Sequence, residues 1–252
     1  MNHFFKEHFP LAAPPWTTLG KKLESMCRKA LHEFCQIENV QKIAIALSGG
    51  KDSLTLLYLL KAISGRGFPP FQLIAIHVGG PFSCGAGVSE GFLKGICQKL
   101  DVPLVICRSQ QKQEDLECYS CSRERRALIF NAAKEAGATT IAFGHHREDN
   151  AETLLMNLLH KAEFAGMLPK VEMRDFGVTI IRPLIFIGEE EIRNFAKMYG
   201  FSRVVCQCPV GQHSLRRKTK ELLQELEKTF PNTLGNLSMA SLKHGSDKAS
   251  RK

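Results

Sequence analysis

Short apolar runs alternate with longer amphipathic stretches along most of the chain. The runs are rich in Ile, Val and Leu, which is typical of buried strands, and they lie at 42–47, 71–78, 102–107, 140–143 and 180–181. The amphipathic stretches predict helices at 18–37, from Leu54 onward, and at 88–100, 121–136, 149–160, 189–199 and 214–228. Strands that alternate with helices in this way predict an α/β protein, in which a parallel sheet carries helices on both faces.

The first predicted strand leads directly into a glycine-rich segment and then into a helix. In it, Gly49 and Gly50 let the backbone turn tightly and bring its N–H groups close to a ligand. The helix that follows adds unpaired N–H donors and a partial positive charge. Ser48 and Ser53 can add hydroxyl groups and Lys51 a full positive charge. The segment therefore predicts a site for phosphate at the carboxyl end of the strand.

Asp52 distinguishes this segment from a Walker loop. That motif would need glycine at position 45 and serine or threonine at position 52, where the chain has Ile45 and Asp52. A carboxylate repels phosphate unless a metal ion lies between them, so we expect Asp52 to meet a nucleotide through Mg²⁺. The alternative is a plain glycine turn that an aspartate and a serine cap.

Two groups of cysteines carry a second candidate chemistry. Cys118 and Cys121 have C-x-x-C spacing directly before a predicted helix, and Cys206 and Cys208 follow far downstream. The spacing alone is consistent with a zinc site, a redox dithiol or an iron–sulfur site. The chain has nine cysteines, an odd number, which argues against a disulfide scaffold in a cytosolic protein.

Composition narrows the class of protein. With 44% hydrophobic and 23% charged residues, the chain resembles ordinary globular proteins, and disorder throughout is excluded. No apolar run reaches the ~18 residues of a membrane span, and the first residues lack the pattern of a signal peptide, so we expect a cytoplasmic protein. Its 34 Lys and Arg against 25 Asp and Glu, a net charge of +9, favour a polyanion such as RNA as partner.

Residues 46–53, ALSGGKDS, resemble the pyrophosphate loop of the ATP-cleaving alpha hydrolase superfamily. Enzymes of that superfamily split ATP between the α- and β-phosphates and activate a carbonyl oxygen as an AMP ester. The resemblance implies a Rossmann-like, adenine nucleotide alpha hydrolase-like fold that uses ATP and Mg²⁺.

Three further segments resemble the tRNA 2-thiocytidine synthetases, and they follow one another in that family's order. They are Cys118–Arg126, Gly144–Leu154 and Arg182–Leu184, within a resemblance that runs from about Lys21 to Met239. The resemblance implies an enzyme that adenylates a cytidine in the anticodon loop of tRNA, at position 32, and replaces its 2-oxygen with sulfur. It implies a cysteine desulfurase as sulfur donor, and a homodimer is compatible with the sequence.

The same resemblance assigns roles to individual residues. It implies a 4Fe-4S cluster held by Cys118, Cys121 and one later cysteine, for which Cys206 fits the spacing to Ser214 better than Cys208 does. It gives catalytic roles to Lys51, Asp52, Cys118 and Cys121. It assigns nucleotide binding to Ser48, Gly49, Gly50, Lys51, Asp52, Ser53, Gly144, His145 and Asp149.

Basic residues near these motifs could contact the RNA. Arg123, Arg125 and Arg126 follow the C-x-x-C pair, and a second basic group contains Arg216, Arg217, Lys218 and Lys220. Either group could bind tRNA phosphates, and either could instead be a solvated basic surface.

The chain departs from the family pattern at three places. The first acid after His-His-Arg is Glu148, the segment His77–Gly80 stands where the family has an acidic residue, and the late cysteines have C-x-C spacing. Three alternatives therefore stay open: a tRNA-isoleucine lysidine synthetase, an enzyme that thiolates another tRNA base, and a non-catalytic, zinc-stabilised tRNA-binding relative.

These expectations divide the chain into four parts. Residues 1–40 form an N-terminal helical segment, and 41–185 form the ATP-binding domain with the embedded C-x-x-C pair. Residues 186–242 form a helical C-terminal extension that contains the third cluster cysteine, and 243–252 are expected to be a disordered tail.

Overall fold

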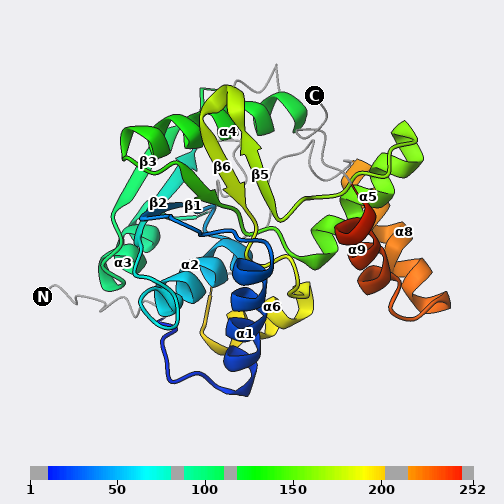
Figure 1. Cartoon of the computed structure of the whole chain (residues 1–252), viewed down its shortest axis with the longest axis horizontal. Helices are drawn as coiled ribbons and strands as arrows, with labels where there is room; N and C mark the ends of the chain where they lie inside the picture. Colours follow the sequence, from blue (N-terminus) through cyan, green and yellow to red (C-terminus); the bar gives the residue numbers. More distant parts are fainter. Residues whose placement is uncertain (1–10, 81–87, 111–117, 202–214, 246–252) are drawn as a thin grey trace, which may run out of the picture.

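A six-stranded sheet lies at the centre of the molecule (Figure 1). The computed structural model describes residues 11–80, 88–110, 118–201 and 215–245. The strands have the order β3-β2-β1-β4-β6-β5. Their bounds are Lys42–Ala46 for β1, Gln72–Gly79 for β2, Leu104–Arg108 for β3, Thr140–Ala142 for β4, Lys170–Met173 for β5 and Val178–Ile181 for β6.

The prediction of an α/β sheet is confirmed, and the sheet differs from it at one edge. Strands β1, β2, β3, β4 and β6 are parallel, whereas β5 pairs antiparallel with β6. A short 3-10 helix (Arg174–Phe176) and Gly177, at φ +64, turn the chain between these two strands. The sequence did not predict β5 because its four residues, KVEM, form no apolar run.

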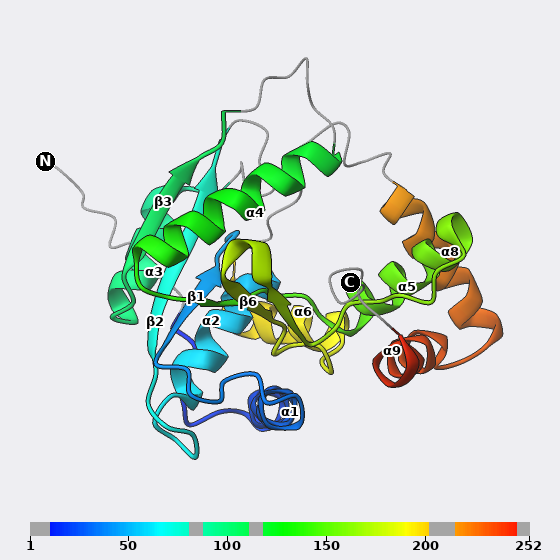
Figure 2. The ribbon, with the colours of Figure 1, turned by 45° about the horizontal axis from the view of Figure 1, so that its top comes forward.

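Helices cover both faces of the sheet, as predicted (Figure 2). In β1, Ile43 and Ile45 belong to one apolar cluster and Ala44 belongs to the other, because alternate side chains of a strand point to opposite faces. The first cluster includes residues of α1 (Thr18–Glu33), α2 (Lys51–Ile63), α3 (Glu90–Lys99) and α6 (Glu189–Met198). The second includes residues of α4 (Cys118–Glu135).

Several helix ends differ from the sequence prediction. Helix α1 ends at Glu33 rather than at Ile37, because the chain turns at Cys35, which has a positive φ of 47°. Helix α4 begins at Cys118 rather than at Cys121. Both cysteines of the C-x-x-C pair therefore lie in the first turn of the helix and not in front of it.

Three helices, α5 (Arg147–Lys161), α8 (Leu215–Thr229) and α9 (Thr233–His244), form a group beside the sheet (Figures 1 and 2). Asn150 of α5 joins them: its Nδ2 donates to Ser238 Oγ at 3.1 Å, and its Oδ1 accepts from Ser241 Oγ at 3.0 Å. The sequence did not predict α9, which continues to His244 and so includes the first two residues assigned to the tail. The helical C-terminal extension is otherwise as expected.

The connections of β1 place a crevice at the carboxyl edge of the sheet. From β1 the chain passes to β2 on one side, and the other neighbour of β1 is β4, so the loops after β1 and β4 diverge. Ligands of open α/β sheets bind in such a crevice. None of the helices in the described ranges is long and apolar enough to cross a lipid bilayer.

Candidate nucleotide site

The loop after β1 is folded around two serine hydroxyl groups. Ser53 Oγ accepts from the N–H of Gly49 at 3.1 Å, and Ser48 Oγ accepts from the N–H of Gly50 at 3.3 Å. The two hydroxyl groups are themselves 3.1 Å apart. Both glycine N–H groups thus lie at the start of α2 with only neutral acceptors, which a phosphate can replace with stronger, charge-assisted bonds.

Glycine is required at two positions of this crevice. Gly49 has φ +84, and a Cβ there would lie 2.8 Å from Cγ1 of Val88. At Gly144, which follows β4, a Cβ would lie 3.1 Å from the backbone N of Ser53. Close packing against the first turn of α2 therefore favours the smallest residue at position 144, which was predicted to bind nucleotide.

His77 occupies the place near the end of β2 where the family has an acid. Its ring is buried, and Nδ1 lies 2.8 Å from the carbonyl oxygen of Leu47, to which it donates. Burial lowers the pKa of His77, so the ring is neutral. This departure replaces a carboxylate with a hydrogen bond that holds the residue directly before the phosphate loop.

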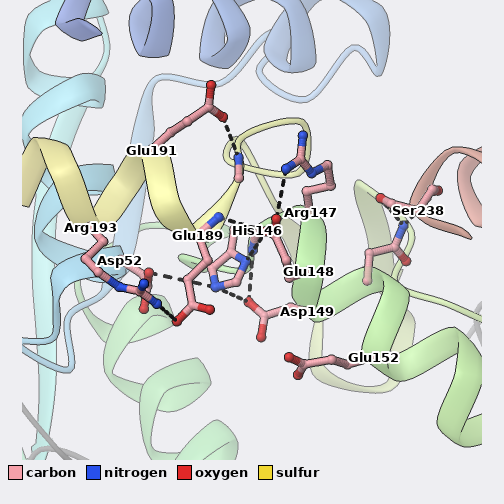
Figure 3. A network of polar contacts seen from close by, with 12 residues as sticks. Asp52, His146, Arg147, Glu148, Asp149, Glu152, Glu189, Glu191, Arg193 and Ser238 are labelled. Atoms are coloured by element: carbon pink, nitrogen blue, oxygen red, sulfur yellow. Dashed lines mark hydrogen bonds and ion pairs between the residues drawn. The ribbon is translucent and has the colours of Figure 1, made fainter. Parts of the chain in front are cut away.

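The two consecutive histidines after β4 have different surroundings. His145 stacks on Phe143 with ring centroids 5.6 Å apart, and its Nδ1 accepts from Arg182 Nε at 3.4 Å. Burial and the charge of Arg182 lower the pKa of His145 to about 3, so this ring stays neutral. His146 is also buried, but it faces the phosphate loop, and its Nε2 lies 3.9 Å from Asp52 Oδ1 (Figure 3).

His146 is the centre of a group of carboxylates. Its Nδ1 lies 3.1 Å from Glu148 Oε2, and its Nε2 lies 3.5 Å from Asp149 Oδ2 (Figure 3). Burial lowers the pKa of His146, but Asp149, Glu148 and Asp52 together outweigh it and raise the pKa above its usual value. Burial also raises the pKa of Glu148, yet His146 and Arg147 outweigh this and hold it at about 2. These contacts therefore favour the charged forms of both the His146 ring and the Glu148 carboxyl group.

The sequence prediction chose His145 and missed His146. In the structure it is His146 that reaches the phosphate loop, and its partner Asp149, which was predicted, accepts from the His146 backbone N–H at 3.0 Å. Neighbouring histidines point to opposite sides of the chain here, and nothing in the sequence distinguishes them. Asp149 keeps a pKa below its usual value because His146 and Arg216 outweigh the effect of its burial.

A pocket of about 550 Å³ lies between the phosphate loop, α5, α6 and α8. Lys51 and Asp52 of the predicted phosphate loop lie in it together with charged side chains from distant positions in the chain. Its lining consists of Lys51, Asp52, His146, Asp149, Glu152, Glu189, Arg216, Arg217, Lys220, Glu221 and Gln224.

Each cation that lies deep in this pocket is paired with a carboxylate. Lys51 Nζ lies 2.9 Å from Asp52 Oδ1 and 3.3 Å from Glu189 Oε1. Arg216 Nε lies 3.2 Å from Glu152 Oε2. Glu152 lies in the segment Gly144–Leu154 that carries the family resemblance, but no role was predicted for it, and Glu189 is one of three consecutive acids at the start of a helix. Only the tertiary structure brings both carboxylates to the pocket.

The cysteines lie at the same edge of the sheet as far as the structure describes them. Ser109, which follows β3, donates to Glu124 of α4 at 2.9 Å, so the first turn of α4 lies beyond the carboxyl ends of the strands. The side chain of Cys121 is half-buried there. The side chain of Cys118, and Cys206 and Cys208 altogether, lie outside the described residues.

Within the described part of the chain, no three His, Cys, Asp or Glu side chains are placed to hold a metal ion by themselves. A Mg²⁺ ion in a nucleotide site keeps several waters and phosphate oxygens, so one or two carboxylates are enough. Asp52, whose side chain is partly exposed in the pocket, fits that requirement.

Comparisons with known proteins agree with this geometry. Residues 21–205 match the model of the PP-loop domain family. The chain is 37% identical over 229 residues to a tRNA-cytidine(32) 2-sulfurtransferase of Anaeromyxobacter dehalogenans, with 87% of this chain and 78% of that protein covered. It is 33% identical over 228 residues to one of Nitrosospira multiformis, with 87% and 76% covered.

A tRNA thiolase is among the solved structures that share the fold. A U34-tRNA thiolase from Methanococcus maripaludis, solved with its 4Fe-4S cluster, superposes with a TM-score of 0.72 at 22% sequence identity, and 92% of this chain and 82% of that chain are covered. The chain thus belongs to the PP-loop family and, within it, to the family of the tRNA-cytidine(32) 2-sulfurtransferases.

Proposed function

We propose that this protein is an ATP-dependent enzyme of tRNA thiolation that adenylates cytidine 32 and replaces its 2-oxygen with sulfur. Its membership of the sulfurtransferase family supports tRNA as the substrate. The observation that carries the proposal is the pocket in which the phosphate loop meets His146, Asp149 and a cationic side of α8. Such a pocket suits the triphosphate of ATP when the bond between its α- and β-phosphates is broken.

The reaction must turn a ring carbonyl oxygen into a leaving group. The cytidine oxygen attacks the α-phosphorus of ATP, which gives an AMP ester and pyrophosphate. Sulfide then attacks ring carbon 2, the bond between that carbon and the oxygen breaks, and AMP leaves with the oxygen while the proton of the sulfide passes to solvent. The base must be unstacked to be reached, which an anticodon loop permits more easily than a duplex does.

Donor and cationic groups of the chain would stabilise the negative charge that develops on pyrophosphate in the first step. The N–H groups of Gly49 and Gly50, the start of α2 and Lys51 all face the position where pyrophosphate would depart. Asp52 would hold Mg²⁺, which neutralises part of the negative charge of the phosphates. His146, whose protonated form its carboxylate neighbours favour, lies between Asp52 and Asp149 and would help to position both.

For the second step we propose Cys118, Cys121 and Cys206 as ligands of a 4Fe-4S cluster. The first turn of α4 fits this role, because a helix N-terminus favours the thiolate form and Cys121 is half-buried there. Held by three cysteines, such a cluster would supply an iron site for the sulfide. We also expect a cysteine desulfurase to deliver that sulfur, and we place the enzyme in the cytoplasm.

The test is anaerobic reaction of the full chain with ATP, sulfide, free lysine and an unmodified tRNA transcript, followed by mass spectrometry of the nucleosides. We expect 2-thiocytidine at position 32 from the native protein. Asp52→Asn should stop both AMP release and thiolation. Cys121→Ala should remove the bound iron and abolish thiolation while the far-ultraviolet circular dichroism stays native.

The matched control is Cys35→Ala, because Cys35 is an exposed cysteine at the end of α1. This variant should keep its iron and its activity. Thiolation that survives in Cys121→Ala, or lysidine in place of 2-thiocytidine, would disprove the proposed reaction. Stoichiometric zinc without iron would instead support the non-catalytic relative.

A further inference from the structure

Glu189 connects the phosphate loop to α8. It is the first residue of α6, and its Oε1 lies 3.3 Å from Nζ of Lys51 while its Oε2 lies 2.7 Å from Nζ of Lys220. Arg193, one turn later, adds a third cation at 3.5 Å from Oε1 (Figure 3). A single carboxylate therefore lies between a lysine of the loop and a lysine of a helix that follows far later in the chain.

The carboxylate is ionised, so a change of protonation does not release it near neutral pH. Burial raises the pKa of Glu189, but Lys220 and Lys51 outweigh this effect and lower it to about 2. Lys51 is likewise kept charged, because Asp52 and Glu189 outweigh its burial. The lysines can therefore leave Glu189 only for another anion that offers them at least as much negative charge.

A nucleotide phosphate is such an anion, and the geometry shows where it would come from. Lys51 belongs to the loop whose N–H groups are suited to pyrophosphate, and the two lysines converge on one point beside it. A phosphate group has more oxygens and more charge than a carboxylate, so it forms stronger charge-assisted bonds to two ammonium groups.

We propose that Glu189 takes the position of a nucleotide phosphate when no nucleotide is bound, and that Lys220 of α8 binds the polyphosphate together with Lys51 once the nucleotide enters. This inference rests on the proposed ATP-dependent function and adds a ligand from a helix that the phosphate-loop motif does not contain. It also makes the position of α8 dependent on the nucleotide, because Lys220 must exchange partners when phosphate arrives.

The phosphate that Lys220 binds is that of the nucleotide rather than that of the tRNA backbone. Lys220 meets Glu189 and, through it, Lys51 within the pocket. Arg217 also lines the pocket, but it pairs with Glu221 of its own helix at 3.2 Å and its side chain is more exposed. If a basic residue of α8 contacts tRNA, Arg217 is therefore better placed to do so than Lys220.

The experiment measures binding of inorganic pyrophosphate and of a non-hydrolysable ATP analogue to the full chain by calorimetry. Lys220→Gln should weaken both affinities by about tenfold, as expected when one charge-assisted hydrogen bond is lost. Glu189→Gln should act in the opposite direction and tighten both severalfold, because it removes the competing anion. These opposite signs distinguish a place-holder from a structural ion pair.

Lys228→Gln is the matched control. Lys228 lies on the same helix and also forms a 2.7 Å ion pair, with Glu225, but it lies outside the pocket. The control should bind pyrophosphate like the native chain. A tRNA-binding assay on the same variants completes the set, and Lys220→Gln should leave the affinity for tRNA within twofold of native.

Three results would overturn the inference. They are unchanged pyrophosphate affinity in Lys220→Gln, weaker binding in Glu189→Gln, and a loss confined to tRNA affinity in Lys220→Gln. Circular dichroism verifies that each variant is folded. If Lys220→Gln does not fold, the change in pyrophosphate affinity of Glu189→Gln alone decides, because the inference requires that this affinity rise. Native protein that binds neither pyrophosphate nor the ATP analogue would instead contradict the proposed function itself.

Discussion

Helices α2 and α9 are buried by opposite kinds of contact. The buried side chains of α2 are mostly leucine and other apolar residues, and these belong to the sheet's first apolar cluster. The buried residues of α9 are two serines, Ser238 and Ser241, which contact Asn150 of α5. The sheet is thus stabilised by burial of apolar surface, whereas the fully buried residues of the last helix are held by hydrogen bonds.

This difference has a functional side. Apolar burial depends little on ligands, so it holds the phosphate loop and the end of β4 in place whether or not a nucleotide is bound. Helix α8 is attached to the pocket through ion pairs with Glu152 and Glu189, and these can exchange when an anion enters. The fold thus combines a rigid phosphate site with a helical group whose attachment is polar.

The largest loss of stability should come from truncating an apolar residue of α2. Leu57 of α2 is fully buried, so Leu57→Ala should lower the free energy of unfolding by ~2–5 kcal/mol through lost burial and the cavity it leaves. Urea unfolding followed by circular dichroism measures it. Leu159→Ala, at a side chain that is 62% exposed, is the control and should change stability little. Equal losses in the two variants would break the comparison.

A smaller and more local effect is expected where α9 is attached. Asn150→Ala removes the acceptor of the Met167 N–H at 2.7 Å and of Ser241, and it should cost about 1–3 kcal/mol. Hydrogen exchange should rise in α9 well before it rises in α2. Asn236→Ala, at an exposed residue of α9 that pairs with Asn232, should leave both rates unchanged. A uniform rise over the whole chain would show that α9 belongs to the core.

The smallest effect is a pH dependence confined to the pocket. The pKa of His146 is raised in the folded state, so its contribution to stability is complete below about pH 6.5, the ordinary histidine pKa, and is lost as pH rises through the folded value. Thermal unfolding of native protein and of His146→Gln should therefore differ most at the acidic end of the range from pH 6 to 9.

His145→Gln is the control for this titration. The pKa of His145 is about 3, so the ring is already neutral throughout that range, and the difference between this variant and the native protein should not change with pH. The absence of a pH-dependent difference at His146 would show that the carboxylates around it do not hold its proton, and a pH-dependent difference at His145 would show that this ring also titrates in the range.

Much of the fold could be predicted because its signals are local along the chain. The apolar runs of β1 and β2 have no other stable place than the inside of a sheet, and the glycines and hydroxyl groups of Ser48–Ser53 lie within one turn of backbone. The exceptions are instructive. Strand β5 has too few apolar residues to stand out, and α9 buries serines, so neither has the periodicity by which sequence patterns are recognised.

The composition of the site was decided by the tertiary structure. The sequence by itself determined that a phosphate loop follows the first strand, and it determined which cysteines have metal-ligand spacing. It could not determine that Glu189 and Lys220 meet Lys51, or that His146 rather than His145 faces Asp52. These contacts join residues that are distant along the chain, and they exist because the strand order brings the ends of β1 and β4 together and α8 folds back over them.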